Sequence, residues 1–251
     1  MRAEHGKLWS TLLEGKYELR SLSEADLEEA LDVNDAAFFA HESVCIGCEI
    51  NLPENEQARK ELRQLCVITA QDGVSLFIRH VESGRIVSVA FNKLQFAPPN
   101  GEEPFFVKFR NEHVKSPQAQ ALMNYMINMD TRIDVCAMYN IDCVLELMYL
   151  GTLPEFGCLG LGRALTEYTV KLAKEFAQGK NLEDVPKELH DKRPAAVTAL
   201  WTSIYTQKIG KSLNFKVLNT VPFTEFKFDG KGFDERIGEL HKFSELVVYK
   251  L

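Results

Sequence analysis

The sequence predicts a single α/β domain, spanning residues 1–251, with a mixed central sheet flanked by helices. Three observations support this fold class. Strand and helix patterns alternate along the whole chain. Hairpin-like strand pairs occur near the start and the end, which indicates antiparallel pairing. A buried strand, a glycine-rich turn and an amphipathic helix follow one another near the centre, and no long linker divides the chain.

The first half of the chain contains two predicted helices and an early hairpin. Tyr17–Arg20 has the pattern of a short strand, and Ser23-Glu-Ala-Asp26 has the pattern of a capping box that starts a helix extending to Phe38. A second helix is expected after Pro53, extending through Leu65. The hairpin pairs residues 74–80 with residues 85–94, and residues 96–101 form a loop.

The second half repeats this mixture of helices and strands. Ser116-Pro117 predicts a helix start, followed by an apolar stripe at Leu122, Tyr125, Met126, Met129, Ile133 and Ala137 that we interpret as core. The other predicted elements are a buried strand at 144–150, a helix closed by Gly179, charged loop or short helix at 180–194, a strand at 196–201, a helix at 203–213, and strands at 215–218, 222–228 and 245–251, with residues 229–232 turning between the last two.

Composition and charge narrow the possible functions. The formal net charge is −7, whereas a protein that binds nucleic acid without specificity carries a basic surplus, so we expect no nucleic-acid partner. The first residues lack the apolar core of a signal peptide, and the most apolar run is too short to cross a bilayer. We therefore expect a cytoplasmic protein without membrane contact. Cys45 and Cys48 have metal-ligand spacing but no second pair, which favours a structural role over metal or redox chemistry.

The glycine-rich turn carries the most chemical information. A buried strand leads into Gly157, Gly160 and Gly162, and a helix opens directly afterwards. Glycines allow a ligand to approach the backbone, and a helix N-terminus offers free N–H groups that suit a pyrophosphate. A Rossmann fingerprint would lie early in a repeated βαβ unit, and a P-loop would require Gly-Lys-Ser/Thr, so neither motif fits. A turn without a ligand remains open on this pattern alone.

The order of several motifs resembles the GCN5-related N-acetyltransferase superfamily, most closely the insect arylalkylamine N-acyltransferases. Gly157-Cys-Leu-Gly-Leu-Gly162 occupies the place of the superfamily's Gln/Arg-x-x-Gly-x-Gly/Ala motif, and Lys211–Leu218 resembles its Lys-Leu-Gly-Phe segment. Residues 38–42, 150–156, 201–206 and Leu240-His241 resemble the insect group, so the resemblance extends from Tyr17 to Leu251. It implies that acetyl-CoA or another acyl-CoA donates an acyl group to a small primary amine, with no metal.

The resemblance also implies roles for individual residues. It implies direct attack of the amine on the thioester, with Glu42 as general base. It also implies that Thr202 and Thr206 lie near the thioester. Thr202 is equally suited to be a helix N-cap. It places Phe39 and His241 at the acceptor pocket, with His41 and His241 as alternative bases. The implied coenzyme-binding residues are Gly151, Thr152, Leu153, Gly157, Cys158, Leu159, Gly160, Leu161, Gly162 and Arg163, with backbone N–H groups of Gly151 to Leu153 as oxyanion donors.

Three positions depart from the family pattern. Gly157 replaces the Gln or Arg that contacts phosphate, Ser43 replaces the Pro after the general base, and Gly210 stands where many members place an acid tyrosine. Arg163 is a candidate to compensate for the first loss. These departures keep open a non-catalytic acyl-CoA-binding protein, besides an enzyme that acylates a polyamine, an amino acid or a protein. We expect a monomer or a weak dimer.

Overall fold

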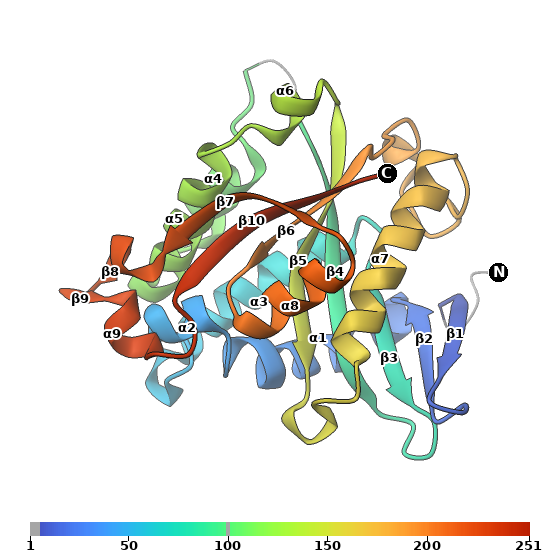
Figure 1. Ribbon diagram of the computed structural model, residues 1–251, viewed down its shortest axis with the longest axis horizontal. Coiled ribbons are helices and arrows are strands. Elements are labelled where there is room, and N and C mark those ends of the chain that lie inside the picture. Colours follow the sequence, from blue (N-terminus) through green and yellow to red (C-terminus); the bar gives the residue numbers. More distant parts are fainter. Residues whose placement is uncertain (1–5, 99–100) are drawn as a thin grey trace.

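A computed structural model describes residues 6–98 and 101–251, and its centre is one eight-stranded sheet (Figure 1). The strand order is β1-β2-β3-β4-β5-β6-β10-β7, and all neighbours pair antiparallel except β5 and β6, which are parallel. The strands are β1 (Leu8–Leu12), β2 (Tyr17–Ser21), β3 (Leu76–His80), β4 (Ile86–Phe96), β5 (Cys143–Thr152), β6 (Ala196–Trp201), β7 (Lys216–Pro222) and β10 (Phe243–Lys250), and the short β8 (Lys227–Phe228) and β9 (Lys231–Gly232) form a separate ribbon.

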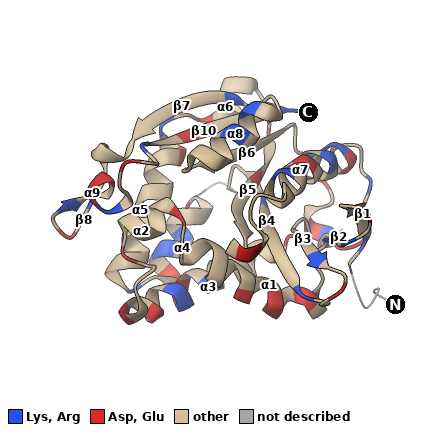
Figure 2. Cartoon of the chain, turned by 60° about the horizontal axis from the view of Figure 1, so that its bottom comes forward, with Lys and Arg blue, Asp and Glu red and all other residues tan. Residues whose placement is uncertain are grey.

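Helices cover both faces of the sheet. On one face lie α1 (Leu27–Asn34), the π-helical segment η2 (Asp35–Phe39), α2 (Ser43–Gly47), α3 (Glu56–Ala70), α4 (Phe105–His113) and α5 (Pro117–Thr131). On the other face lie α7 (Leu161–Ala177) and α8 (Ile204–Ser212), as Figure 2 shows. The short helices α6 (Val135–Tyr139) and α9 (Phe233–Ile237) lie at the periphery, and α9 packs against α2.

The two parallel strands at the middle of the sheet separate along their length. β5 and β6 pair only over Val144–Leu147 and Ala196–Ala199, although β5 continues to Thr152 and β6 to Trp201. β5 also carries a bulge at Met148, because Phe91 pairs with Tyr149 while the next residue of β4 pairs with Leu147. The sheet is therefore open between the ends of β5 and β6.

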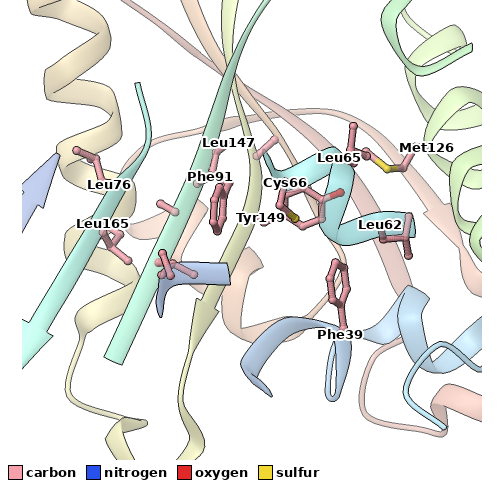
Figure 3. Packing of buried hydrophobic residues seen from close by; sticks show 14 of the residues in the cluster. Phe39, Leu62, Leu65, Cys66, Leu76, Phe91, Met126, Leu147, Tyr149 and Leu165 are labelled. Atoms are coloured by element: carbon pink, nitrogen blue, oxygen red, sulfur yellow. The ribbon is translucent and has the colours of Figure 1, made fainter. Parts of the chain in front are cut away.

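An aromatic cluster fixes η2 against this open part of the sheet. Tyr149 is 2% exposed, and its ring makes edge contacts with Phe38, Phe39 and Phe91 at centroid distances of 5.0, 6.1 and 6.3 Å. Figure 3 shows Tyr149 with Phe39 and Phe91. Edge-to-face pairs stabilise a core by about 0.5–1.5 kcal/mol each beyond their burial. The chain that leaves η2 therefore starts from a rigid point beside the end of β5.

The predicted fold class is confirmed, and most predicted elements are found within a few residues of their expected bounds. The strand at residues 196–201 has the expected bounds. The prediction lacks β1, α2, α4 and α9, and it does not separate α6 and β9 from their neighbours. α2 and α9 are single turns of five residues each, too short to show a helical period. The first five residues and part of the loop predicted at 96–101 lie outside the described residues.

Three local predictions are wrong. The Ser23 hydroxyl bonds the Asp26 carboxylate at 2.6 Å rather than a backbone N–H, so no capping box forms there. The strand expected at 222–228 is interrupted by the 3₁₀ turn η6 (Phe223–Glu225), so the turn at 229–232 joins β8 to β9 rather than to the last strand. The apolar stripe of α5 ends at Thr131, before Ile133 and Ala137.

Glu146 places a carboxyl group inside the sheet. The residue is 6% exposed, and Gln95 Nε2 donates to its Oε2 at 2.8 Å. The neighbouring ammonium of Lys93 is bonded to Asp72 at 2.9 Å. Burial, and then the charge of Asp130, raise the pKa of Glu146 to about 8. The folded protein therefore keeps this proton at a pH where the unfolded chain, with an ordinary glutamate pKa of about 4.3, has lost it.

We expect this group to make the free energy of unfolding fall as the pH rises from about 5 to 8, because over that range unfolding releases a proton. Glu146→Gln keeps an acceptor for Gln95 and removes the titration. It should raise the melting temperature more at pH 8 than at pH 5, by about 2–4 °C for each kcal/mol recovered. Melting curves of both proteins across this range test the expectation, and equal shifts at the two pH values would contradict it.

Candidate active site

The turn between β5 and α7 is open to solvent and presents backbone N–H groups. It begins with the 3₁₀ turn η4 (Pro154–Phe156) and ends at Gly160, the N-cap of α7, whose φ is +77°. A Cβ built at Gly160 would meet no atom within 4 Å, and residues 157–160 are all exposed. The first N–H groups of a 17-residue helix therefore face open space, which fits an anionic ligand.

The side chains of this turn offer fewer groups for binding an anionic ligand than its backbone does. Leu161 is 2% exposed and belongs to the core, and Cys158 adopts a positive φ of 61°. The guanidinium of Arg163 lies 3.2 Å from Glu167 and 3.4 Å from the Ser212 hydroxyl, so it already has partners on α7 and α8. Gly157 has an ordinary φ of −63° and supplies no side chain.

The end of β5 offers fewer free N–H groups than the sequence predicts. The N–H of Leu153 donates to Val87 O on the edge of β4 at 2.9 Å, so it is not available as an oxyanion donor. N–H groups alternate in direction along an antiparallel pair, so the Gly151 N–H also points toward β4. Thr152 lies between them, and its N–H points into the opening beside β6, while its Oγ1 bonds the Ser88 hydroxyl at 2.7 Å.

Glu42 lies between η2 and α2, two elements that cover the opposite face of the sheet from α7. It is the N-cap of α2, and its Oε2 accepts from Cys45 N at 2.8 Å. Its Oε1 is buried and has no hydrogen-bond partner within residues 6–98 and 101–251. One carboxylate oxygen is thus fixed, and the other keeps its lone pairs for a donor that is not part of the described chain.

His241 lies close enough to Glu42 for the carboxylate charge to affect its pKa. Its Nδ1 accepts from Ile204 N at 3.3 Å, so the ring holds its proton on Nε2. Burial lowers the pKa of His241, although the Glu42 carboxylate opposes that shift. His241 is therefore neutral at pH 7, and its ring packs edge-on to Tyr205 at 5.6 Å. Tyr205 is 60% exposed, beside the open end of β6.

The two threonines differ in their surroundings. Ser203, not Thr202, is the N-cap of α8, because it forms a capping box with Thr206. The Thr206 hydroxyl donates to Ser203 O at 3.0 Å and is part of this cap. Thr202 precedes the helix and is half-buried, and its carbonyl oxygen accepts from the Ser43 hydroxyl at 2.8 Å. The two threonines therefore do not share a helix face.

The remaining predicted residues differ in their exposure. Phe39 is 1% exposed and lies in the aromatic cluster beneath the site, while His41 is exposed. Cys45 and Cys48 are buried free thiols, and burial raises the pKa of each. Over the described part of the chain, no group of three His, Cys, Asp or Glu residues could hold a metal ion. In the same part of the chain, no helix is both long and apolar enough for a membrane span.

Gly210 shows why this chain has no tyrosine at that position. A Cβ at Gly210 would lie 2.4 Å from Trp201 Nε1. The Trp201 indole is 2% exposed and occupies the space between β6 and α8, and its N–H has no acceptor among the described residues. A large side chain at Gly210 and the indole of Trp201 therefore exclude each other. A glycine within the helix pattern of residues 203–213 was the sequence signal for this close approach.

Comparison with known proteins identifies the fold. No family model and no curated protein matches the sequence. Among solved structures, the chain resembles arylalkylamine N-acetyltransferase 2 from Aedes aegypti, with a TM-score of 0.73 and 18% identity over 93% of this chain and 98% of that one. The Drosophila melanogaster polyamine N-acetyltransferase, which forms N-acetylagmatine, gives a TM-score of 0.70 and 16% identity over 94% and 100%.

A third structure, the putative arylalkylamine N-acetyltransferase 7 from Aedes aegypti, gives a TM-score of 0.71 and 15% identity over 98% of this chain and 95% of that one. These likenesses cover nearly the full chain. The protein therefore has the fold of the GCN5-related N-acetyltransferases, and the resemblance seen in the sequence is confirmed at the level of the fold.

Two helical glycines test how tightly the site is packed. Gly210→Ala should destabilise the protein by about 1–3 kcal/mol, because its Cβ overlaps the indole of Trp201. Gly162→Ala is the matched control, since its Cβ would lie at ordinary contact distance, 3.7 Å from Ile209. It should be neutral or stabilising by up to about 1 kcal/mol from helix propensity. Equal free energies of unfolding for the two variants in urea titrations would contradict this packing.

Proposed function

We propose that the protein is an acyl-CoA-dependent N-acyltransferase that acts on a small primary amine. The observation that carries this proposal is the state of Glu42. Its Oε2 is fixed by Cys45 N, and its buried Oε1 has no partner among the described residues. An ammonium donor would satisfy that oxygen, and acylation of an amine requires removal of its proton by a positioned base.

The turn before α7 supports an acyl-CoA as the second substrate. A pyrophosphate needs several N–H donors and room for close approach, and Gly160 with the first turn of α7 supplies both. The loss of Gln or Arg at position 157 removes one charged contact but none of these backbone donors. Because Arg163 already pairs with Glu167, we assign it a secondary role in holding the phosphates.

The reaction follows from groups on both sides of the opening. Glu42 takes a proton from the ammonium, and the free amine attacks the thioester carbonyl. The C–N bond forms and the attacking nitrogen gives up its second proton. The C–S bond breaks, and the coenzyme leaves as a thiolate that gains a proton. We assign the Thr152 N–H to the carbonyl oxygen, as the strand direction supports. We assign to the Thr202 hydroxyl the relay of the nitrogen's second proton to this thiolate, which leaves the hydroxyl itself unchanged, since that of Thr206 serves the helix cap.

The rim of the site favours an amine with an apolar body. Tyr205 is 60% exposed and Leu240 is 54% exposed, and both adjoin His241. An arylalkylamine would place its ring against such side chains and its ammonium at Glu42. A polyamine is the second candidate, because Glu146 adds another buried carboxyl group to the same face of β5, three residues before Tyr149. A second cation of the acceptor would pair with Glu146 once it displaced the proton that burial keeps on this carboxyl group.

Release of the coenzyme thiol from acetyl-CoA, measured with a panel of amines, tests the proposal directly. Phenylethyl- and indolylethylamines should be used beside agmatine, spermidine, amino acids and a lysine peptide. Faster release with one amine class defines the acceptor. A protein that binds acetyl-CoA but releases no thiol with any amine would be a non-catalytic binding protein, and the proposal would then be wrong.

Acetyl-CoA should raise the melting temperature of the protein, because it binds the native state selectively. Gly160→Glu should remove this increase by placing bulk and negative charge in the phosphate turn. Gly15→Glu is the matched control, since Gly15 has a similar φ of +85°, open surroundings and a position in the β1–β2 turn. It introduces the same strain and charge away from the turn and should keep the increase. An undiminished increase in Gly160→Glu would refute the assignment.

Glu42→Gln keeps the shape of the side chain and removes its basicity. It should lower kcat/KM by about 10²- to 10⁴-fold, and the rise of kcat/KM with pH should flatten or move toward the pKa of the acceptor amine. Acetyl-CoA affinity should be unchanged. The control Glu56→Gln alters an exposed glutamate of α3 that pairs with Lys60, and it should be silent. If Glu42→Gln retains the parental rate and pH profile, Glu42 is not the base.

A further inference from the structure

Ser43 makes a hydrogen bond that joins two distant parts of the chain. Its hydroxyl donates to Thr202 O at 2.8 Å, across 159 positions of the sequence, and Ser43 is 2% exposed. Ser43 directly follows Glu42, and Thr202 directly follows the last residue of β6. The bond therefore joins the segment that carries the carboxylate to the end of the strand that borders the opening.

The neighbouring anchors show what this bond adds. Before Glu42, η2 is held against β5 by the aromatic cluster around Tyr149. After it, α2 is held against α9, because a Cβ at Gly47 would lie 2.7 Å from Phe233 and Glu49 pairs with Arg236 at 2.8 Å. None of these contacts involves β6. The Ser43 bond reaches the β6 side, beyond the point where β5 and β6 cease to pair.

We propose that Ser43 is a positioning residue, whose hydrogen bond to Thr202 sets the distance between Glu42 and the end of β6 across the opening of the sheet. This inference rests on the proposed function, in which Glu42 is the base and the thioester lies in that opening. The family pattern has a proline at this position, which restricts the backbone by its ring. Ser43 replaces that local restraint with a link to the facing strand.

Ser43→Ala should impair proton transfer more than coenzyme binding. It removes the tie to β6, and small displacements of a reacting group can cost about 10²-fold in rate, so kcat/KM should fall by about 10- to 100-fold. The affinity for acetyl-CoA should stay within about two-fold of the parent, since the phosphate turn lies on the other face of the sheet and loses no donor. Ser43→Thr keeps the hydroxyl and should restore most of the activity.

A double-mutant cycle distinguishes an effect of Ser43 on the position of Glu42 from a general destabilisation of the fold. Ser43→Ala and Glu42→Gln should be measured alone and together, because residues that act through one another are not additive. If Ser43 acts through Glu42, Ser43→Ala should lose most of its effect on kcat/KM once Glu42 is already glutamine. Ser75→Ala is the structural control: Ser75 is 1% exposed, its Oγ accepts from Asn92 N at 3.1 Å, and it lies away from Glu42.

Ser75→Ala should lower the melting temperature to an extent similar to Ser43→Ala, and it should leave kcat/KM close to the parental value. The inference is overturned if the losses from Ser43→Ala and Glu42→Gln multiply fully, or if Ser43→Ala matches Ser75→Ala in activity. Those results leave the proposed function standing. A parental rate for Glu42→Gln alone would instead overturn the proposed base and the role of Ser43 together.

Discussion

The end of hydrogen bonding between β5 and β6 is the constraint on which the candidate site depends. The strands pair with each other over four residue pairs, and beyond these β5 remains paired only with β4 and β6 only with β10. A sheet that parts in this way exposes N–H groups at its centre, which are costly unless a ligand or water accepts from them. The bulge at Met148 shifts the pairing register of β5 just before the opening between β5 and β6. As a result, the Thr152 N–H points into this opening. The opening is thus built into the strand register.

Both faces of the sheet supply groups to this opening, and they do so by different means. On the α7 face the donors are backbone N–H groups at a helix N-terminus, which need glycine and space rather than particular side chains. On the α1 face the functional group is one carboxylate, whose place depends on the packing of Tyr149 against η2. Ser43 adds a hydrogen bond, and this bond links the segment of the proposed base to the end of β6.

The sequence predicts the fold better than it predicts the site. Apolar periodicity locates the long elements, because burial requires that pattern whatever the neighbours are. It does not show where paired strands separate, which depends on contacts between residues far apart, and so three N–H groups were expected where Leu153 is already bonded to Val87. Ser203 and Thr202 are both good N-cap residues, and only the backbone shows which one precedes α8. Ser43 gave no signal except its departure from proline.

The departures at positions 157 and 210 both concern side chains that the family resemblance implies at the coenzyme. Each removes a side chain that would contact the coenzyme, yet the groups that remain are main-chain donors or residues held by the fold. At Gly210 the replacement follows from volume, because the indole of Trp201 fills the space that a Cβ would enter. In the proposed reaction, the absence of a tyrosine there means that the thiolate would take its proton from another donor at the end of β6. We propose Thr202, whose carbonyl oxygen accepts from the Ser43 hydroxyl, as that donor.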